Sequence, residues 1–259
     1  MIIGVGEIIS RSVKLYRDNT KLFLKYVLII LIPSILVGFT NVLLGSLTFS
    51  EFPIMGSINW MYVPVYAICA ITLSVISFWI SIAFVRVVAK RYQNASVEPT
   101  MVELKTASKL ILPVAWVSIL TGLAVFGGIL LVVIPGIIFA IWFSFSYYGA
   151  SIDGKHGTEA MKYSKHLVQG RWWGTFWRIA APNVVFSFLY GIIQSILGLI
   201  IRALPLSVDV NAIILASISA VISILVIPLT TSALTILYIE MKNNPVTMDI
   251  PVTAEPPKA

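Results

Sequence analysis

The stretch LILPVAWVSILTGLAVFGGILLVVIPGIIFAIWFSFSYYGASI, residues 110–152, runs for 43 residues without Asp, Glu, Lys or Arg. A bilayer core needs about 20 apolar residues per crossing helix, so the stretch is too long for one helix and suits two. Gly127-Gly128 and Pro135-Gly136 interrupt or turn a helix and mark the expected break. The stretch therefore predicts a helical hairpin in a membrane.

Four more charge-free runs, at 26–50, 52–85, 179–201 and 210–239, accompany it. Only 11% of the residues are charged, against about 25% in soluble domains. These runs predict an all-α, polytopic membrane protein whose domain covers 1–240, followed by a proline-rich, disordered cytoplasmic tail at 241–259. The six transmembrane helices are expected at about 26–47, 63–88, 109–131, 135–151, 175–201 and 211–239.

The basic residues predict the orientation of these helices. With six crossings, 17 of the 18 Lys and Arg residues fall on one side, and only Arg202 falls on the other. Short loops rich in Lys and Arg stay in the cytoplasm, which places both termini there and the protein in the cytoplasmic (inner) membrane. The net charge of +7 therefore needs no nucleic-acid partner, and the same charges attract anionic lipid headgroups.

The segments before each expected hairpin carry apolar residues at helical spacing. They predict three amphipathic cytoplasmic helices that lie at the interface. Their expected apolar faces are Val5, Ile9, Val13 and Tyr16; Met101, Leu104, Ser108 and Ile111; and Ala160, Met161, Ser164, Leu167 and Val168. Gly170 stands where a C-cap glycine would end the third helix. We expect these helices to orient the hairpins, with lipid sensing or partner docking as the alternative.

Each of these segments also has a Glu followed five residues later by a Ser: Glu7/Ser12, Glu103/Ser108 and Glu159/Ser164. In all three, the serine falls in the apolar face. The pattern suggests three parallel copies of one unit, a surface helix followed by a hairpin. Chance is the alternative, because two-residue matches are common.

The segment GRWWGTFWR, residues 170–178, precedes the fifth expected crossing. Tryptophan is frequent at headgroup level, and arginine can reach lipid phosphates. We therefore expect a lipid-headgroup or interface site, either a general anchor or a specific headgroup pocket. Its residues are Arg171, Trp172, Trp173, Trp177 and Arg178.

Catalytic signatures are missing from the sequence. No nucleophile motif or phosphate loop occurs, so we expect neither an enzyme nor a cofactor. Asp153, His156 and Glu159 have a conceivable metal spacing, but Gly154 and Gly157 interrupt it, and no metal is expected.

The membrane-spanning helices contain no ionisable residue near their centres, which argues against proton relay or voltage sensing. Asn183, Gln194 and Asn211 are neutral polar residues there. They form either a small polar site or hydrogen bonds that hold helices together.

The segment 134–178 contains Pro135-Gly136-Ile137, Glu159-Ala160, Ser164, Gly170 and Trp172-Trp173. With these features it resembles the membrane domain fused to some glycerophosphodiester phosphodiesterases, and the related YciC-like inner-membrane proteins. The resemblance implies a bacterial-type cytoplasmic-membrane protein with several helices. It supplies no catalytic residues.

The leading hypothesis is a non-enzymatic multi-pass protein that binds anionic lipid or a membrane protein partner through its basic amphipathic helices. The alternative is a transporter or channel for a small or amphiphilic solute, with a cavity lined by Asn183, Gln194 and Asn211. An intramembrane enzyme ranks last, because no acid–base pair is available.

Overall fold

The computed structural model describes residues 2–48, 63–205 and 207–245. Within these ranges the chain forms helices and no strand. The helices are α1 (Val5–Asp18), α2 (Thr20–Thr48), α3 (Val63–Tyr92), α4 (Thr100–Ser108), α5 (Ile111–Leu131), α6 (Val133–Trp142), α7 (Ser146–Asp153), α8 (Gly157–Val168), α9 (Trp172–Arg202) and α10 (Val208–Asn243).

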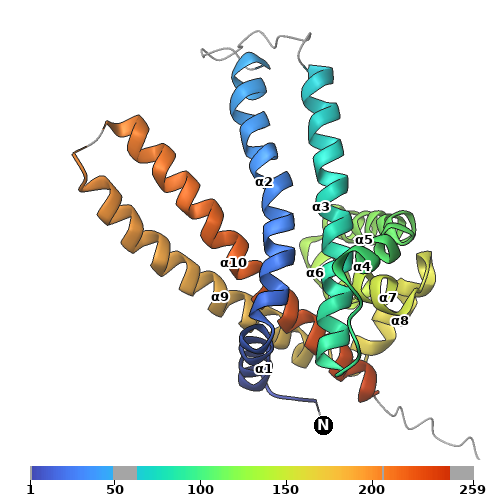
Figure 1. Cartoon of the computed structure of the whole chain (residues 1–259). Coiled ribbons are helices and arrows are strands. Elements are labelled where there is room, and N and C mark those ends of the chain that lie inside the picture. The colour runs from blue at the N-terminus through green and yellow to red at the C-terminus, as the bar shows by residue number, and fades with distance from the viewer. Residues whose placement is uncertain (1, 49–62, 206, 246–259) are drawn as a thin grey trace, which may run out of the picture.

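Successive helices pair along the chain as α2 with α3, α5 with α6, and α9 with α10. Another helix, α1, α4 or α8, precedes each pair. Figure 1 shows α1 and the end of α10 at one end of the bundle, from which the α2–α3 and α9–α10 pairs diverge. We call α1, α4, α8 and the adjoining helix ends the base. The element order agrees with the predicted one, whereas superposition of three repeats stays a prediction.

In the described part of the chain, five helical segments are long and apolar enough to cross a membrane. They are Val63–Tyr92, Ile111–Leu131, Val133–Asp153, Trp172–Arg202 and Ser217–Asn243. Only 11% to 39% of each segment's most apolar window is buried, so most of this apolar surface faces outward. Soluble monomers rarely expose apolar patches of this kind, which indicates embedding in a membrane. The first expected crossing, 26–47, falls within α2, but most of its side chains lie outside the described ones, so six crossings stay a prediction.

The fourth expected crossing, 135–151, is not one continuous helix. It divides into α6 and α7 around a turn at 143–145. The buried hydroxyl of Ser164 accepts a hydrogen bond from the Phe145 amide at 3.0 Å and donates one to the Trp142 carbonyl at 2.7 Å. The break is stable because a side chain of α8 bonds the backbone groups that the helix leaves free.

The glycines near the hairpin turn serve close packing. The helix α5 continues through Gly127-Gly128, and the chain reverses at Val132 instead. Gly128 and Gly136 face each other: a Cβ at Gly136 would lie 2.9 Å from the Ile129 amide nitrogen, and one at Gly128 would lie 3.0 Å from the Gly136 Cα. The reversal at Val132 falls between the expected helices 109–131 and 135–151, so the position of this break is confirmed.

The buried core lies mostly at the base. One cluster joins α2, α3, α4 and α5 and includes Phe23, Tyr26 and Phe84; a second joins α1, α7, α8 and α10 and includes Phe145 and Tyr238. The distal parts of α5 and α9 expose large apolar side chains, such as Leu131 at 78% and Leu199 at 73%. Helix packing thus stabilises the base, whereas the distal segments expose apolar side chains to the medium around the protein.

The apolar face predicted for α8 is confirmed, since Ala160, Ser164, Leu167 and Val168 are buried. Gly170 also takes the expected left-handed conformation just after that helix, with φ of 79°.

The face predicted for α4 is confirmed at Leu104, which is buried, and wrong at Met101, which is 78% exposed, and at Ser108, which is exposed. Glu103 is buried instead, and its carboxylate pairs with Lys90 on α3 and accepts a bond from the Glu98 amide at 3.3 Å. This pairing turns the acidic side of α4 inward.

The face predicted for α1 is rotated. Its buried residues are Ile8 and Ser12, whereas Val13 is 44% exposed, because α1 packs on α10 and α9. At the other end of the chain, α10 continues to Asn243 and buries Met241, so the predicted tail begins later than 241. The rest of that tail, 246–259, lies outside the described residues.

We expect Gly136→Ala to force α5 and α6 apart, because the new methyl group would meet backbone atoms of Ile129. Overpacking of this kind costs about 2 kcal/mol. Thermal unfolding in a bilayer measures the loss. Gly122→Ala is the control, because a Cβ there meets nothing within 4 Å. Equal effects of the two substitutions would contradict the close packing.

We expect Ser164→Ala to destabilise the turn between α6 and α7, because the Phe145 amide then has no acceptor. A buried donor without a partner costs about 2 kcal/mol. Ser108→Ala removes the corresponding serine of the predicted repeat, which is exposed and bonds only within α4, and should change stability little. Hydrogen exchange of the 143–145 amides reports the local effect; unchanged exchange in Ser164→Ala would refute the role.

Candidate functional site

Arg171 of the predicted interface site joins the ends of two helices. Its Nε donates to the Leu167 carbonyl at 2.7 Å in the last turn of α8. Its two terminal nitrogens donate to the Met241 carbonyl at 2.9 Å and the Asn244 carbonyl at 2.6 Å, at the end of α10. The last carbonyls of a helix lack intrahelical partners, and a guanidinium group satisfies them well. Burial lowers the pKa of Arg171, and the nearby charge of Arg178 lowers it further.

Arg178 holds the N-terminal segment to α9. Its Nε donates to the Ile3 carbonyl at 2.8 Å, and one terminal nitrogen donates to the Gly174 carbonyl at 2.9 Å. Arg171 thus bonds to backbone near the C-terminal end of the described chain, and Arg178 bonds to backbone near its N-terminal end. Their predicted contact with lipid headgroups stays a prediction, and the internal bonds are the role that sequence reasoning missed.

The tryptophans of this segment divide into two sets. Trp172 is half-buried and stacks on Phe176, with ring centroids 5.8 Å apart and planes 11° apart. Trp173 and Trp177 are 69% and 60% exposed and lie at the start of a candidate membrane span. That exposure suits rings at headgroup level, where tryptophan is enriched.

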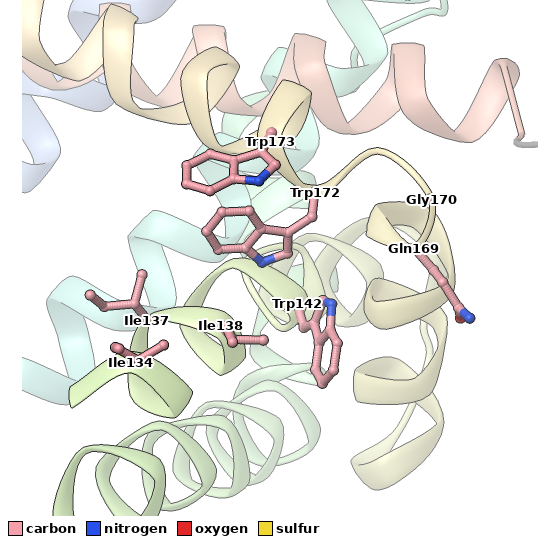
Figure 2. A pocket seen from close by; sticks show the side chains of 8 residues that line it. All are labelled: Ile134, Ile137, Ile138, Trp142, Gln169, Gly170, Trp172 and Trp173. Atoms are coloured by element: carbon pink, nitrogen blue, oxygen red, sulfur yellow. The ribbon is translucent and has the colours of Figure 1, made fainter. Parts of the chain in front are cut away.

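An apolar groove of 580 Å³ lies beside Trp172, between α6, the end of α8 and the start of α9. Its lining residues are Ile134, Ile137, Ile138, Trp142, Gln169, Gly170, Trp172 and Trp173. Figure 2 shows the two indoles of α9 above the isoleucines of α6, with Gln169 at the far side. No charged residue lines the groove, so it suits an apolar chain.

Polar groups stand at one side of this groove. The Nζ of Lys165 lies 4.4 Å from the ring centroid of Trp142, a cation–π contact. The indole nitrogen of Trp172 is buried and has no hydrogen-bond partner. Gln169 is exposed. The groove therefore has an uncharged, mostly apolar lining with one unused donor, and a cation lies over Trp142, one of its lining residues.

The predicted polar site in the outer part of the bundle is not assembled. Asn183 donates to the Ile179 carbonyl of its own helix at 2.7 Å and lies eleven residues before Gln194, about 16 Å along α9. Gln194 accepts a hydrogen bond from Ser219 on α10 at 2.7 Å, beside a 370 Å³ cavity. Asn211 precedes Ser219 by eight residues, about 12 Å along α10. Gln194 thus links two helices, and neither Asn183 nor Asn211 is among the described residues that line the cavity beside it.

Several ionic groups at the base make contacts that the sequence did not reveal. Arg11 of α1 donates to Tyr92 at 2.6 Å and to Glu240 at 3.0 Å, and Tyr92 donates to Glu240 at 2.6 Å. This network ties α1, α3 and α10 together. The partners are 81 to 229 residues apart in sequence, so no local pattern indicates them.

The carboxylates of the conceivable metal site have other partners. Asp153 accepts hydrogen bonds from Tyr238 and, at 2.7 Å, from Lys242, both on α10. Glu159 pairs with Lys155 at 2.8 Å, and this contact lowers the pKa of Glu159. Among the described residues, no group of three His, Cys, Asp or Glu side chains is placed to hold a metal ion.

Other basic side chains at the base are exposed and have no carboxylate partner among the described residues. They are Lys14, Lys21, Lys25, Arg91, Lys105, Lys109 and Lys162. The structure thus separates basic residues that hold the base together from basic residues that point outward.

No protein-family model, no curated protein and no solved structure matches the chain. The resemblance of segment 134–178 to phosphodiesterase-linked membrane domains therefore stays a prediction.

We expect Arg171→Lys to loosen the end of α10, because an ammonium group cannot reach the Leu167, Met241 and Asn244 carbonyls together. Losing charge-assisted hydrogen bonds of this kind costs about 2 kcal/mol. Thermal unfolding and hydrogen exchange at 241–244 measure the effect in neutral bilayers. Arg91→Lys, at an exposed position without an ion pair, is the control. A loss seen only in anionic bilayers would mean that Arg171 acts on lipid instead.

Proposed function

We propose that the chain is a non-enzymatic multi-pass protein of the cytoplasmic membrane, with both termini in the cytoplasm, that binds anionic lipid through its base. The observation that carries the proposal is the set of seven exposed basic side chains, all on the base, that have no carboxylate partner within the described part of the chain. The exposed apolar spans support embedding in a bilayer. The excess of Lys and Arg supports a cytoplasmic base.

Exposed lysines at a membrane surface are attracted electrostatically to anionic lipid, and this attraction stabilises the bound protein. Each contributes about 1 kcal/mol when it lies near a negatively charged leaflet, and the effect falls with added salt. The cations that bond inside the base, Arg11, Arg171 and Arg178, are already engaged with the protein. Lipid attraction is therefore assigned to the exposed set, rather than to the arginines beside the tryptophans.

The transporter alternative has less support. Asn183, Gln194 and Asn211 were its expected cavity lining, and they lie at different depths along α9 and α10. The cavity beside Gln194 also lies between two helices of one hairpin, with Ser219 and Arg202 on its wall. No observation extends it across the bundle.

We expect the protein to be more stable in bilayers of phosphatidylcholine and phosphatidylglycerol than in phosphatidylcholine alone. The triple variant Lys21→Gln, Lys25→Gln, Lys105→Gln should lose a little under half of that gain, because it removes three of the seven exposed charges and each contributes about 1 kcal/mol. Thermal unfolding at low and high salt measures both effects.

Arg202→Gln is the control, because Arg202 is exposed at the other end of α9 from the base. It should keep the full gain. Equal stability of the wild-type protein in both bilayers would overturn the proposal. Turnover of glycerophosphodiesters by the purified protein would contradict its non-enzymatic part.

A further inference from the structure

We propose that the groove between α6, α8 and α9 binds one anionic phospholipid, with an acyl chain against Ile134 and Ile138 and the phosphate at Lys165. The inference rests on the proposed function and deepens it. It replaces general attraction to the lipid surface with one site of defined residues. The occupant is a phospholipid because the groove offers both an apolar wall and a cation.

The apolar part of the groove lies within candidate membrane spans. Its isoleucines belong to α6, in the span Val133–Asp153, and its indoles belong to the first turn of α9. A lipid chain can therefore enter from the bilayer without crossing water. The volume of 580 Å³ lies within the range of about 300–1,000 Å³ that is usual for small-molecule sites.

The charged part of the site is Lys165. Its ammonium group lies over Trp142, a residue of the groove wall, and none of the described carboxylates forms an ion pair with it. Arg171 is close in sequence, but its guanidinium group bonds to the ends of α8 and α10. Lys165 is thus the cation that remains for an anionic headgroup, and zwitterionic lipid gains less from it.

The indole nitrogen of Trp172 adds a second polar contact. It is buried without an acceptor, a condition that native proteins usually avoid. Figure 2 shows this nitrogen on the edge of the ring that faces α6. An ester or phosphate oxygen of a lipid in the groove would supply the acceptor. The unused donor and the uncompensated lysine thus both point to an oxygen-rich, negatively charged group.

Native mass spectrometry of the full chain tests the site. The protein is released from bilayers that contain equal amounts of phosphatidylglycerol and phosphatidylcholine, and the retained lipid is identified. We expect one retained phosphatidylglycerol. Lys165→Gln should reduce the preference for it roughly tenfold, as for other hydrogen bonds to charged groups. Arg202→Gln also removes one positive charge, at the end of α9 away from the base and outside the exposed basic set, and should leave the preference unchanged.

A second pair of variants tests the apolar wall. Ile138→Trp fills the groove and should lower retention of either lipid, whereas Leu123→Trp adds the same side chain at an exposed position on α5 and should not. Should Ile138→Trp fail to fold, the comparison of Lys165→Gln with Arg202→Gln still decides the proposal.

The outcomes that would contradict the proposal can be told apart. If anionic lipid stabilises the protein but all four variants retain lipid like the wild type, the groove assignment is wrong and the proposed function stands. If phosphatidylcholine is retained as well as phosphatidylglycerol, the anionic occupant is wrong. A dimer that Ile138→Trp dissociates would make a second copy the occupant and overturn the proposal. If neither bilayer changes stability, the proposed function fails too.

Discussion

A backbone amide or carbonyl inside a bilayer has no water to bond, and the rest of this structure depends on that constraint. Long helices satisfy it along their length, but the middle hairpin breaks at 143–145. Ser164 resolves the conflict, because one buried hydroxyl bonds both the Trp142 carbonyl and the Phe145 amide. The surface helix α8 thereby becomes part of the hairpin's own hydrogen bonding. The position of α8 then fixes where Gly170 ends it and where α9 begins.

Charge has two separate uses at the base. Arg11, Arg171 and Arg178 bond to groups far away in sequence and hold α1, α8, α9 and α10 together. Seven other basic side chains point outward without acidic partners. The first set is already hydrogen-bonded within the protein, and the second set is exposed at the surface. An excess of Lys and Arg on one side of a membrane protein can thus arise from residues with quite different physical roles.

The groove between α6, α8 and α9 also depends on which basic residues bond inside the protein. Because Arg171 is held by helix ends, Lys165 is the cation beside the apolar wall of α6 and α9. The tryptophans divide in the same way: Trp172 packs on Phe176 and borders the groove, and Trp173 is mostly exposed. One short segment therefore contributes to the packing of the base, to the groove wall and to the outer surface.

The sequence by itself determined the helical class, the order of surface helices and hairpins, and the face of α8, because apolar periodicity and charge-free length are local properties. It located α9 within a few residues of its observed ends. It did not place Glu103 inside, because the carboxylate is buried only by its pairing with Lys90 on another helix. It grouped Asn183, Gln194 and Asn211 by residue type, although helix rise separates them. The sequence predicted a lipid-headgroup role for Arg171. It did not indicate the hydrogen bonds from Arg171 to the Met241 and Asn244 carbonyls, because these partners are 70 and 73 residues away along the chain. Only the tertiary structure decided which polar groups bond inside the protein, because hydrogen-bond partners are chosen by distance in space.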